Sequence, residues 1–187
     1  MARPLEDMTV AILVTQGFEQ IELTSPREAL DEAGATTHIV SPESGSIRAW
    51  DMKDWGETFE VDVTLEEAKP GDYDALLLPG GVLNPDKLRM NDKAVQFVRA
   101  FFEDERPVAA ICHGPWTLVE ADVVEDRTMT SYRSLRTDLL NAGANWVDEE
   151  VVTDGNLVTS RNPDDLPAFN EATISLFSKA KREAVGS

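Results

Sequence analysis

Cysteine and histidine are scarce in this chain, whose 187 residues include one cysteine, Cys112, and two histidines. A single thiol cannot form a disulfide framework, and we expect it to stay reduced in the cytoplasm. Two histidines and one cysteine also show no spacing typical of metal ligands. The sequence therefore predicts neither a disulfide-stabilised fold nor a metal site.

Basic residues are also few. Lys and Arg number 17 against 35 Asp and Glu, which gives a formal net charge of −18 and a pI near 4.3. Nucleic acids and anionic membrane surfaces are bound through clustered basic residues, so we expect neither as a partner. No apolar run approaches the roughly 20 residues of a membrane span, and no targeting segment is visible. Without a GxGxxG or P-loop motif, no nucleotide cofactor is expected.

Hydrophobic residues make up 42% of the chain, enough for one domain covering residues 1–187. Short apolar runs, which predict buried strands, alternate with helical patterns. The predicted strands are 9–15, 36–41, 74–78 and 107–111, and the predicted helices are 21–33, 91–103, 114–121, 134–142 and 166–184. A hairpin is expected around Asp154-Gly155, and an excursion over residues 43–64. This alternation predicts a three-layer, doubly wound α/β fold with a mostly parallel sheet and helices on both faces.

Residues suited to chemistry follow three of the predicted strands. Glu19 lies just after the first, Gly80-Gly81 after the third, and Cys112-His113 after the fourth. Ligands of open parallel sheets bind beyond the carboxyl ends of the strands. We therefore expect these residues to meet at one edge of the sheet.

Cys112 lies between a predicted strand and a predicted helix with almost no loop, which is typical of a nucleophile elbow. The start of the helix would lower the thiol pKa. A lone cysteine after an apolar strand is more often an inert core residue, but the following His-Gly-Pro favours a functional role. His113 could act as a general base, or its backbone N–H could donate to an oxyanion.

Each of the other candidate residues could have either a role in the site or a purely structural role. Gly80-Gly81 could form part of an oxyanion hole or a simple turn. Glu19 could share a proton with Cys112 or be a solvated acid at a helix start. Asp86 could orient a histidine, although it is one of 35 acids. His38 lies within a predicted strand without a visible partner and is interpreted as structural.

Five segments carry a resemblance to a known family. They are Gly17–Leu23, Asp74–Gly81, Ala110–Pro115, Asn141–Ala144 and Leu157–Pro167. Together they resemble the DJ-1/PfpI family of the class I glutamine-amidotransferase-like superfamily, and are closest to its branch of PfpI-like intracellular proteases and general stress proteins. The resemblance implies a flavodoxin-like fold.

The resemblance also implies roles for individual residues. Cys112 corresponds to the nucleophile, His113 to its neighbour in the motif, and Glu19 to the acid that hydrogen-bonds the thiol. Gly81 and the His113 backbone N–H correspond to the oxyanion hole. In PfpI-like relatives an acid from an adjoining subunit completes a Cys–His–acid triad. Asp86 falls near that position, but as Asp rather than Glu and slightly further from Gly81. A homo-oligomer, dimeric or larger, is therefore expected.

These observations lead us to expect a cytoplasmic stress-response cysteine hydrolase. Its substrates would be peptides, glycated proteins or α-oxoaldehydes of the methylglyoxal type, as for a peptidase, deglycase or glyoxalase. The alternative is a non-catalytic redox sensor or stress chaperone that uses the same oxidisable cysteine. A structural stress protein with a vestigial site is a third possibility. The sequence does not decide whether Trp50 and Trp55 contact a ligand or only pack.

Overall fold

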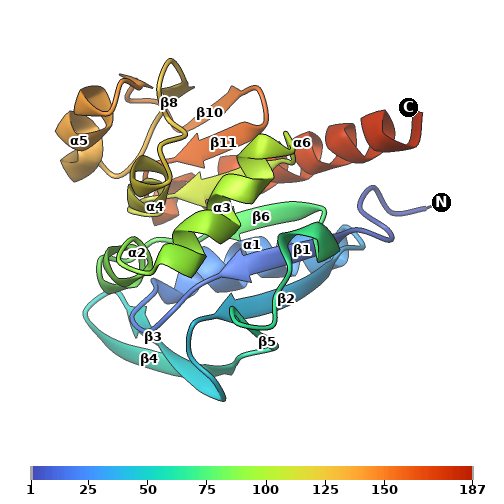
Figure 1. The fold of residues 1–187 in the computed structure, drawn as a ribbon, viewed down its shortest axis with the longest axis horizontal. Helices are drawn as coiled ribbons and strands as arrows, with labels where there is room; N and C mark the ends of the chain where they lie inside the picture. Colours follow the sequence, from blue (N-terminus) through green and yellow to red (C-terminus); the bar gives the residue numbers. More distant parts are fainter. Residues whose placement is uncertain (1, 187) are drawn as a thin grey trace.

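A seven-stranded sheet forms the centre of the computed structural model, which describes residues 2–186 (Figure 1). The spatial order is β10-β11-β7-β6-β1-β2-β5. The strands are β1 (Thr9–Leu13), β2 (Thr36–Ser41), β5 (Val63–Thr64), β6 (Ala75–Leu78), β7 (Val108–Ile111), β10 (Val151–Asp154) and β11 (Leu157–Ser160). Neighbours are parallel except β10 and β11, which form the expected hairpin. Because β2 and β6 lie on opposite sides of β1, the connections diverge between β1 and β6, where a ligand site is expected.

Helices cover both faces of this sheet. They are α1 (Gln20–Glu32), α2 (Leu83–Leu88), α3 (Asp92–Glu103), α4 (Pro115–Glu120), α5 (Arg136–Asn141) and α6 (Leu166–Gly186). The long helix α6 packs on α1 behind the sheet in Figure 1, whereas α3 packs on α4 in front of it. This arrangement confirms the three-layer, mostly parallel α/β fold.

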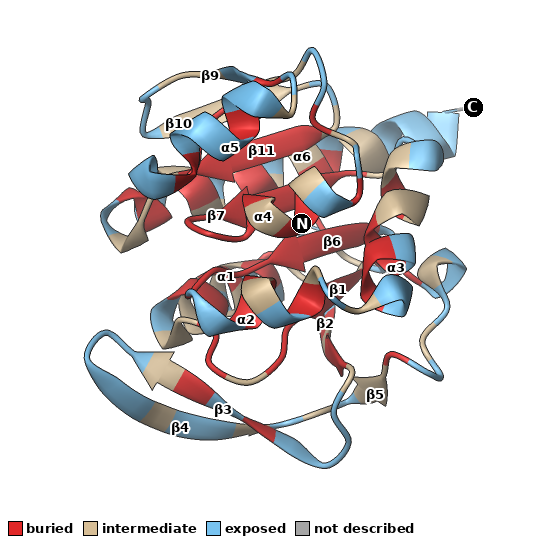
Figure 2. Cartoon of the chain, turned by 60° about the vertical axis from the view of Figure 1, so that its left-hand side comes forward, coloured by how far each residue is buried: buried red, intermediate tan, exposed pale blue. Residues whose placement is uncertain are grey.

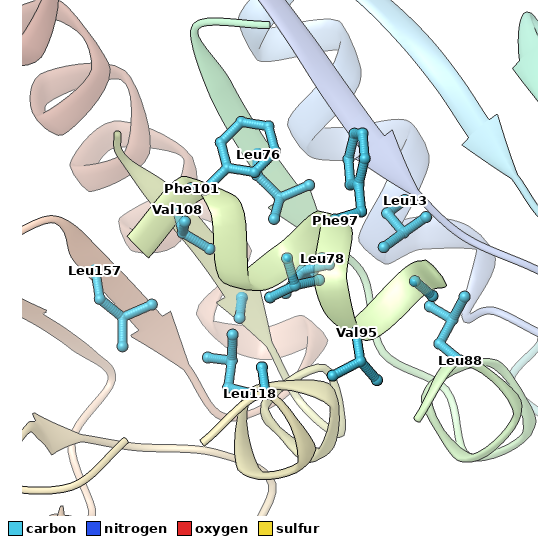
Figure 3. Packing of buried hydrophobic residues seen from close by; sticks show 14 of the residues in the cluster. Leu13, Leu76, Leu78, Leu88, Val95, Phe97, Phe101, Val108, Leu118 and Leu157 are labelled. Carbon is cyan, nitrogen blue, oxygen red and sulfur yellow. The ribbon is translucent and has the colours of Figure 1, made fainter. Parts of the chain in front are cut away.

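The helix α3 illustrates how the sequence specifies its elements. The Asn91 side chain caps the helix by accepting a hydrogen bond from the Ala94 N–H at 3.1 Å. Apolar residues at 94, 95, 98 and 101 recur at helical spacing and are all buried. In Figure 3 the rings of Phe97 and Phe101 point toward Leu76 and its neighbours on the sheet. The amphipathic pattern of α3 thus decides which face of the helix meets the sheet.

The strands read as uninterrupted apolar runs because both of their faces are covered. All four residues of β6 and of β7 are buried, and Figure 2 shows the middle of the sheet as the most buried part of the molecule. Alternate side chains enter different cores: Leu76 and Leu78 join the α3 side, whereas Ala75 and Leu77 join the α1–α6 side. Such double coverage is typical of a parallel sheet.

Residues 43–64 leave the central sheet, as expected, and form an antiparallel hairpin of β3 (Ser46–Asp51) and β4 (Asp54–Glu60). Most of β4 is exposed, so the hairpin forms an arm at one side of the molecule (Figure 2). A further small sheet pairs β8 (Thr128–Met129) with β9 (Asn145–Trp146). None of the helices in residues 2–186 has the length and apolar character needed to cross a membrane.

Candidate active site

Cys112 lies at a sharp turn between β7 and α4, as the spacing predicts. Its φ is 62°, in the left-handed region that residues other than glycine rarely adopt. The backbone on both sides is held, because the Cys112 N–H donates to the Ser160 carbonyl and its own carbonyl accepts the Tyr132 N–H. A Cβ on Gly114 would lie 2.6 Å from the Leu78 carbonyl oxygen, so only glycine fits after the motif's histidine. The strained conformation is therefore fixed by its surroundings.

The ring of His113 faces the thiol. Its Nδ1 atom lies 3.2 Å from the Cys112 Sγ. The ring stacks on Tyr132 at a centroid distance of 4.6 Å and meets the edge of Trp116 at 5.2 Å. Burial lowers the pKa of His113 to about 4, so the imidazole is neutral at pH 7 and its free nitrogen can accept a proton. The pair of adjacent residues can interact only because the turn is strained.

The acid that interacts with the thiol is Glu22, which corrects the prediction of Glu19. Glu22 is 0% exposed, and its Oε1 accepts the Gly80 N–H at 3.0 Å. Its carboxyl interacts with the Cys112 thiol, and its Oε2 has no hydrogen-bond partner within residues 2–186. Burial, reinforced by the negative charge of Glu19, raises the pKa of Glu22 to about 8. Glu22 is therefore protonated at neutral pH and can donate its proton toward the sulfur.

Glu19 occupies a different place in the site. It precedes α1, is half-buried, and its Oε1 accepts the Met52 N–H at 2.9 Å. Burial raises the pKa of Glu19, and the nearby Asp51 adds to this rise. The structure thus places Glu19 beside the β3–β4 hairpin rather than on the sulfur.

The thiol itself is buried, with only 7% of Cys112 exposed. Burial, together with the charge of Glu22, raises the pKa of the Cys112 thiol, whereas the N–H groups of Gly81 and His113 act in the opposite direction. The predicted lowering of this pKa is therefore wrong. Desolvation outweighs the backbone donors, and α4 is a helix of only six residues. The sulfur needs a base, rather than its own acidity, to become nucleophilic.

The glycine pair brings the β6 loop against the sulfur. A Cβ on Gly80 would lie 2.8 Å from the Cβ of Cys112, and one on Gly81 would lie 2.7 Å from the Glu19 nitrogen. Gly81 also has a φ of 79°, which favours glycine. These close approaches let the Gly81 N–H reach the sulfur, which is the geometry expected of an oxyanion hole.

Asp86 does not reach His113 within the chain. It lies in α2 and forms an ion pair with Arg89 at 2.7 Å, with about half of its side chain exposed. The group that meets Nε2 of His113 is Ser134, at 3.3 Å, a residue for which the sequence carries no signal. The contribution of Asp86 across a subunit interface stays a prediction.

A cavity of about 590 Å³ opens above the thiol. It is lined by Gly17, Glu19, Glu22, Trp50, Met52, Gly81, Val82, Leu83, Cys112, His113, Tyr132 and Pro163. Trp50 belongs to the lining, whereas Trp55 meets Trp50 edge-on at 5.6 Å and lies outside it. Residues 2–186 contain no cluster of three His, Cys, Asp or Glu side chains able to hold a metal ion. The cavity combines apolar walls with a floor of thiol, imidazole and carboxyl groups.

The sequence matches the DJ-1/PfpI family over residues 8–176. Three relatives have informative names. The Bacillus subtilis protein "Putative cysteine protease YraA" is 46% identical over 90% of this chain and 97% of its own length. "General stress protein 18" of the same species is 44% identical over 91% and 98%, respectively. "Deglycase PfpI" of Pyrococcus furiosus is 43% identical over 91% and 99%.

A solved structure shows the same fold. It is a two-domain protein of Anabaena variabilis with DJ-1/ThiJ/PfpI-like and ferritin-like domains. The TM-score is 0.85 at 36% identity, and the match covers 90% of this chain and 48% of that one. The flavodoxin-like architecture implied by the sequence is therefore confirmed.

Proposed function

Because the chain belongs to the DJ-1/PfpI family, we propose that it is a stress-response cysteine hydrolase in which Cys112 is the nucleophile and His113 the base. The names of its relatives support a hydrolase-type activity. The observation that carries the assignment is the 3.2 Å contact between the Cys112 Sγ and the His113 Nδ1 at the floor of the cavity. An inert core cysteine would have neither an imidazole partner nor an open cavity.

The first chemical step transfers the thiol proton to His113 as the sulfur attacks a carbonyl carbon. His113 is placed for this step because its Nδ1 lies 3.2 Å from the sulfur, and burial lowers its pKa so that the ring is neutral with one nitrogen free to accept a proton. The carbonyl oxygen gains negative charge, which the N–H groups of Gly81 and His113 stabilise. Glu22, protonated below pH 8, supplies a proton donor beside the sulfur. Each group thereby has one task, set by its environment.

The same attack serves each proposed substrate class. With an amide, the tetrahedral adduct expels the amine and leaves a thioester, which water hydrolyses. A hemiaminal formed by glycation of an amine first loses the amine and regenerates the α-oxoaldehyde. With an α-oxoaldehyde, the sulfur adds to the aldehyde carbon to form a hemithioacetal. A proton then moves from that carbon to the adjacent one, and water hydrolyses the resulting thioester to a 2-hydroxy acid. Atoms balance in both cases with water as the co-reactant.

The alternative function is a redox sensor that uses the same thiol. A peroxide would oxidise Cys112 to sulfenic and then sulfinic acid, whose oxygens could accept hydrogen bonds from the surrounding donors. The donors available to these oxygens are the Gly81 and His113 N–H groups and protonated Glu22. Oxidation consumes the nucleophile, so a pure sensor shows no turnover.

Turnover therefore separates the two functions. The wild-type protein and a Cys112→Ser variant would be assayed for loss of methylglyoxal, for release of free thiols or amines from their glycated forms, and for peptide cleavage. We expect at least one activity in the wild type to exceed the variant by more than 100-fold. Equal rates in both proteins would reject the hydrolase and favour the sensor. Gel filtration of the same samples would test the proposed homo-oligomer, and fractionation of cells would test the proposed cytoplasmic location.

A further inference from the structure

The cavity above Cys112 has an uneven distribution of charge. Its lining contains two carboxyl groups, Glu19 and Glu22, and no lysine or arginine. The remaining lining is glycine, proline and apolar or aromatic side chains apart from Cys112 and His113. The cavity that opens onto the thiol therefore presents carboxyl groups and no basic side chain.

The two carboxyl groups differ in their remaining capacity to accept hydrogen bonds from a ligand. Glu22 is fully buried, accepts the Gly80 N–H and faces the sulfur, so it is committed to the floor of the site. Its Oε2 has no hydrogen-bond partner within the part of the chain that the structure describes. The Glu19 side chain is half-buried and accepts one hydrogen bond within residues 2–186, from the Met52 N–H. A carboxylate can accept about four hydrogen bonds, so Glu19 keeps capacity for a ligand group.

We propose that Glu19 selects electrophiles by charge. The cavity then favours carbonyl compounds that carry an ammonium or guanidinium group, accepts neutral ones less readily, and disfavours anionic ones such as α-keto acids or phosphorylated sugars. The apolar walls, including Trp50 and Leu83, contact the uncharged part of the molecule, and Glu19 contacts the cation. The natural substrate class rests on the proposed function, whereas charge selection at the thiol does not.

Because Cys112 is the only cysteine, its modification rate reports on this cavity alone. Three methanethiosulfonates would be compared: the cationic trimethylammonioethyl and anionic sulfonatoethyl reagents, which are similar in size, and the smaller neutral methyl reagent. In each reaction the sulfur forms a disulfide with the reagent, methanesulfinate leaves with the electron pair, and the thiol proton goes to solvent. Rates would be divided by those of free cysteine with the same reagent, which removes the intrinsic differences between reagents.

The variants are Glu19→Gln and a control, Glu103→Gln. The amide oxygen at position 19 can still accept the Met52 N–H, so the variant removes charge while keeping the contact. Glu103 is exposed at the end of α3, shortly before β7 begins, and Cys112 follows the other end of that strand. Substitution of Glu103 changes the net charge equally. The control therefore corrects for the general attraction of cations to a chain of net charge −18.

In the wild type we expect the cationic reagent to react on the order of tenfold faster than the anionic one after normalisation. Glu19→Gln should reduce this ratio at least threefold, and Glu103→Gln should leave it within experimental error. A wild-type ratio near one, or an equal loss in both variants, would overturn the proposal. If none of the three turnover activities exceeds that of Cys112→Ser while the ratio behaves as expected, the hydrolase assignment fails and the charge selection stands.

Discussion

Removing the buried charge site at Glu22 should stabilise the protein, and by an amount that depends on pH. The pKa of Glu22 is raised from 4.5 to about 8, so between these values the folded state holds a proton that the unfolded state has lost. The contribution of Glu22 to folding stability therefore decreases as pH rises from about 4.5 to 8, and is constant outside this window. At pH 7 the loss is about 3 kcal/mol, from 1.4 kcal/mol for each of roughly 2.5 pH units.

The variant that tests this reasoning is Glu22→Gln, because the amide can still accept the Gly80 N–H and fill the same space. Urea denaturation at pH 7 should show a gain of about 3 kcal/mol, or about 10 °C in Tm, that disappears at pH 4. Glu103→Gln is the matched control, since it removes the same charge from an exposed side chain and should change stability much less. A gain of equal size at pH 4 and pH 7 would refute the linkage, and so would a loss of stability at pH 7.

Three shorter predictions test other parts of the structure. Gly81→Ala should destabilise the protein by more than 1 kcal/mol in urea and abolish turnover, because its φ is 79° and a Cβ there would lie 2.7 Å from the Glu19 nitrogen. The alkylation rate of Cys112 should show no step near pH 6.5, because His113 titrates near pH 4; a step there that His113→Gln removes would contradict the assignment. Phe101→Ala should lower the free energy of unfolding by about 3–5 kcal/mol, since the ring is 0% exposed, and a loss below 1 kcal/mol would mean that the α3 core is misjudged.

The sequence predicts the central sheet closely because its signals are local. The strand at 36–41 is observed with the same bounds, and the helix predicted at 91–103 begins one residue later because Asn91 is its cap. Continuous apolar runs indicate strands buried on both faces, and the structure shows such burial in β6 and β7. The ends of the elements are predicted less closely. The strand predicted over 9–15 stops at Leu13, where the backbone turns into the loop of the site.

The choice between Glu19 and Glu22 was also within reach of the sequence. The buried face of α1 contains Leu23, Pro26 and Leu30, and Glu22 lies on that face, four residues before Pro26. An acid on the buried stripe of a helix needs a partner, which here is the site itself. Glu19 precedes the helix and lies outside this periodicity, so the same pattern predicts a more exposed position at the rim of the cavity.

The wall of the cavity could not be derived from local patterns. The β3–β4 hairpin reaches the site through contacts between distant residues: the Trp50 N–H donates to the Phe18 carbonyl, and the Met52 N–H donates to Glu19. These contacts depend on how the hairpin arm docks, and hairpin docking is set by tertiary packing rather than by spacing.

Docking of the hairpin separates the two acids into different environments. Met52 draws the Glu19 carboxylate to the half-exposed rim, and burial between α1 and the glycine pair keeps Glu22 protonated. Two carboxyl groups that interact strongly cannot both be ionised in a dry site, so their different burial decides which holds the proton. Glu22 can therefore act as a proton donor at the sulfur while Glu19 provides the negative charge at the entrance. If Glu19 and Glu22 were equally exposed, their environments would not distinguish the proton donor from the charged group.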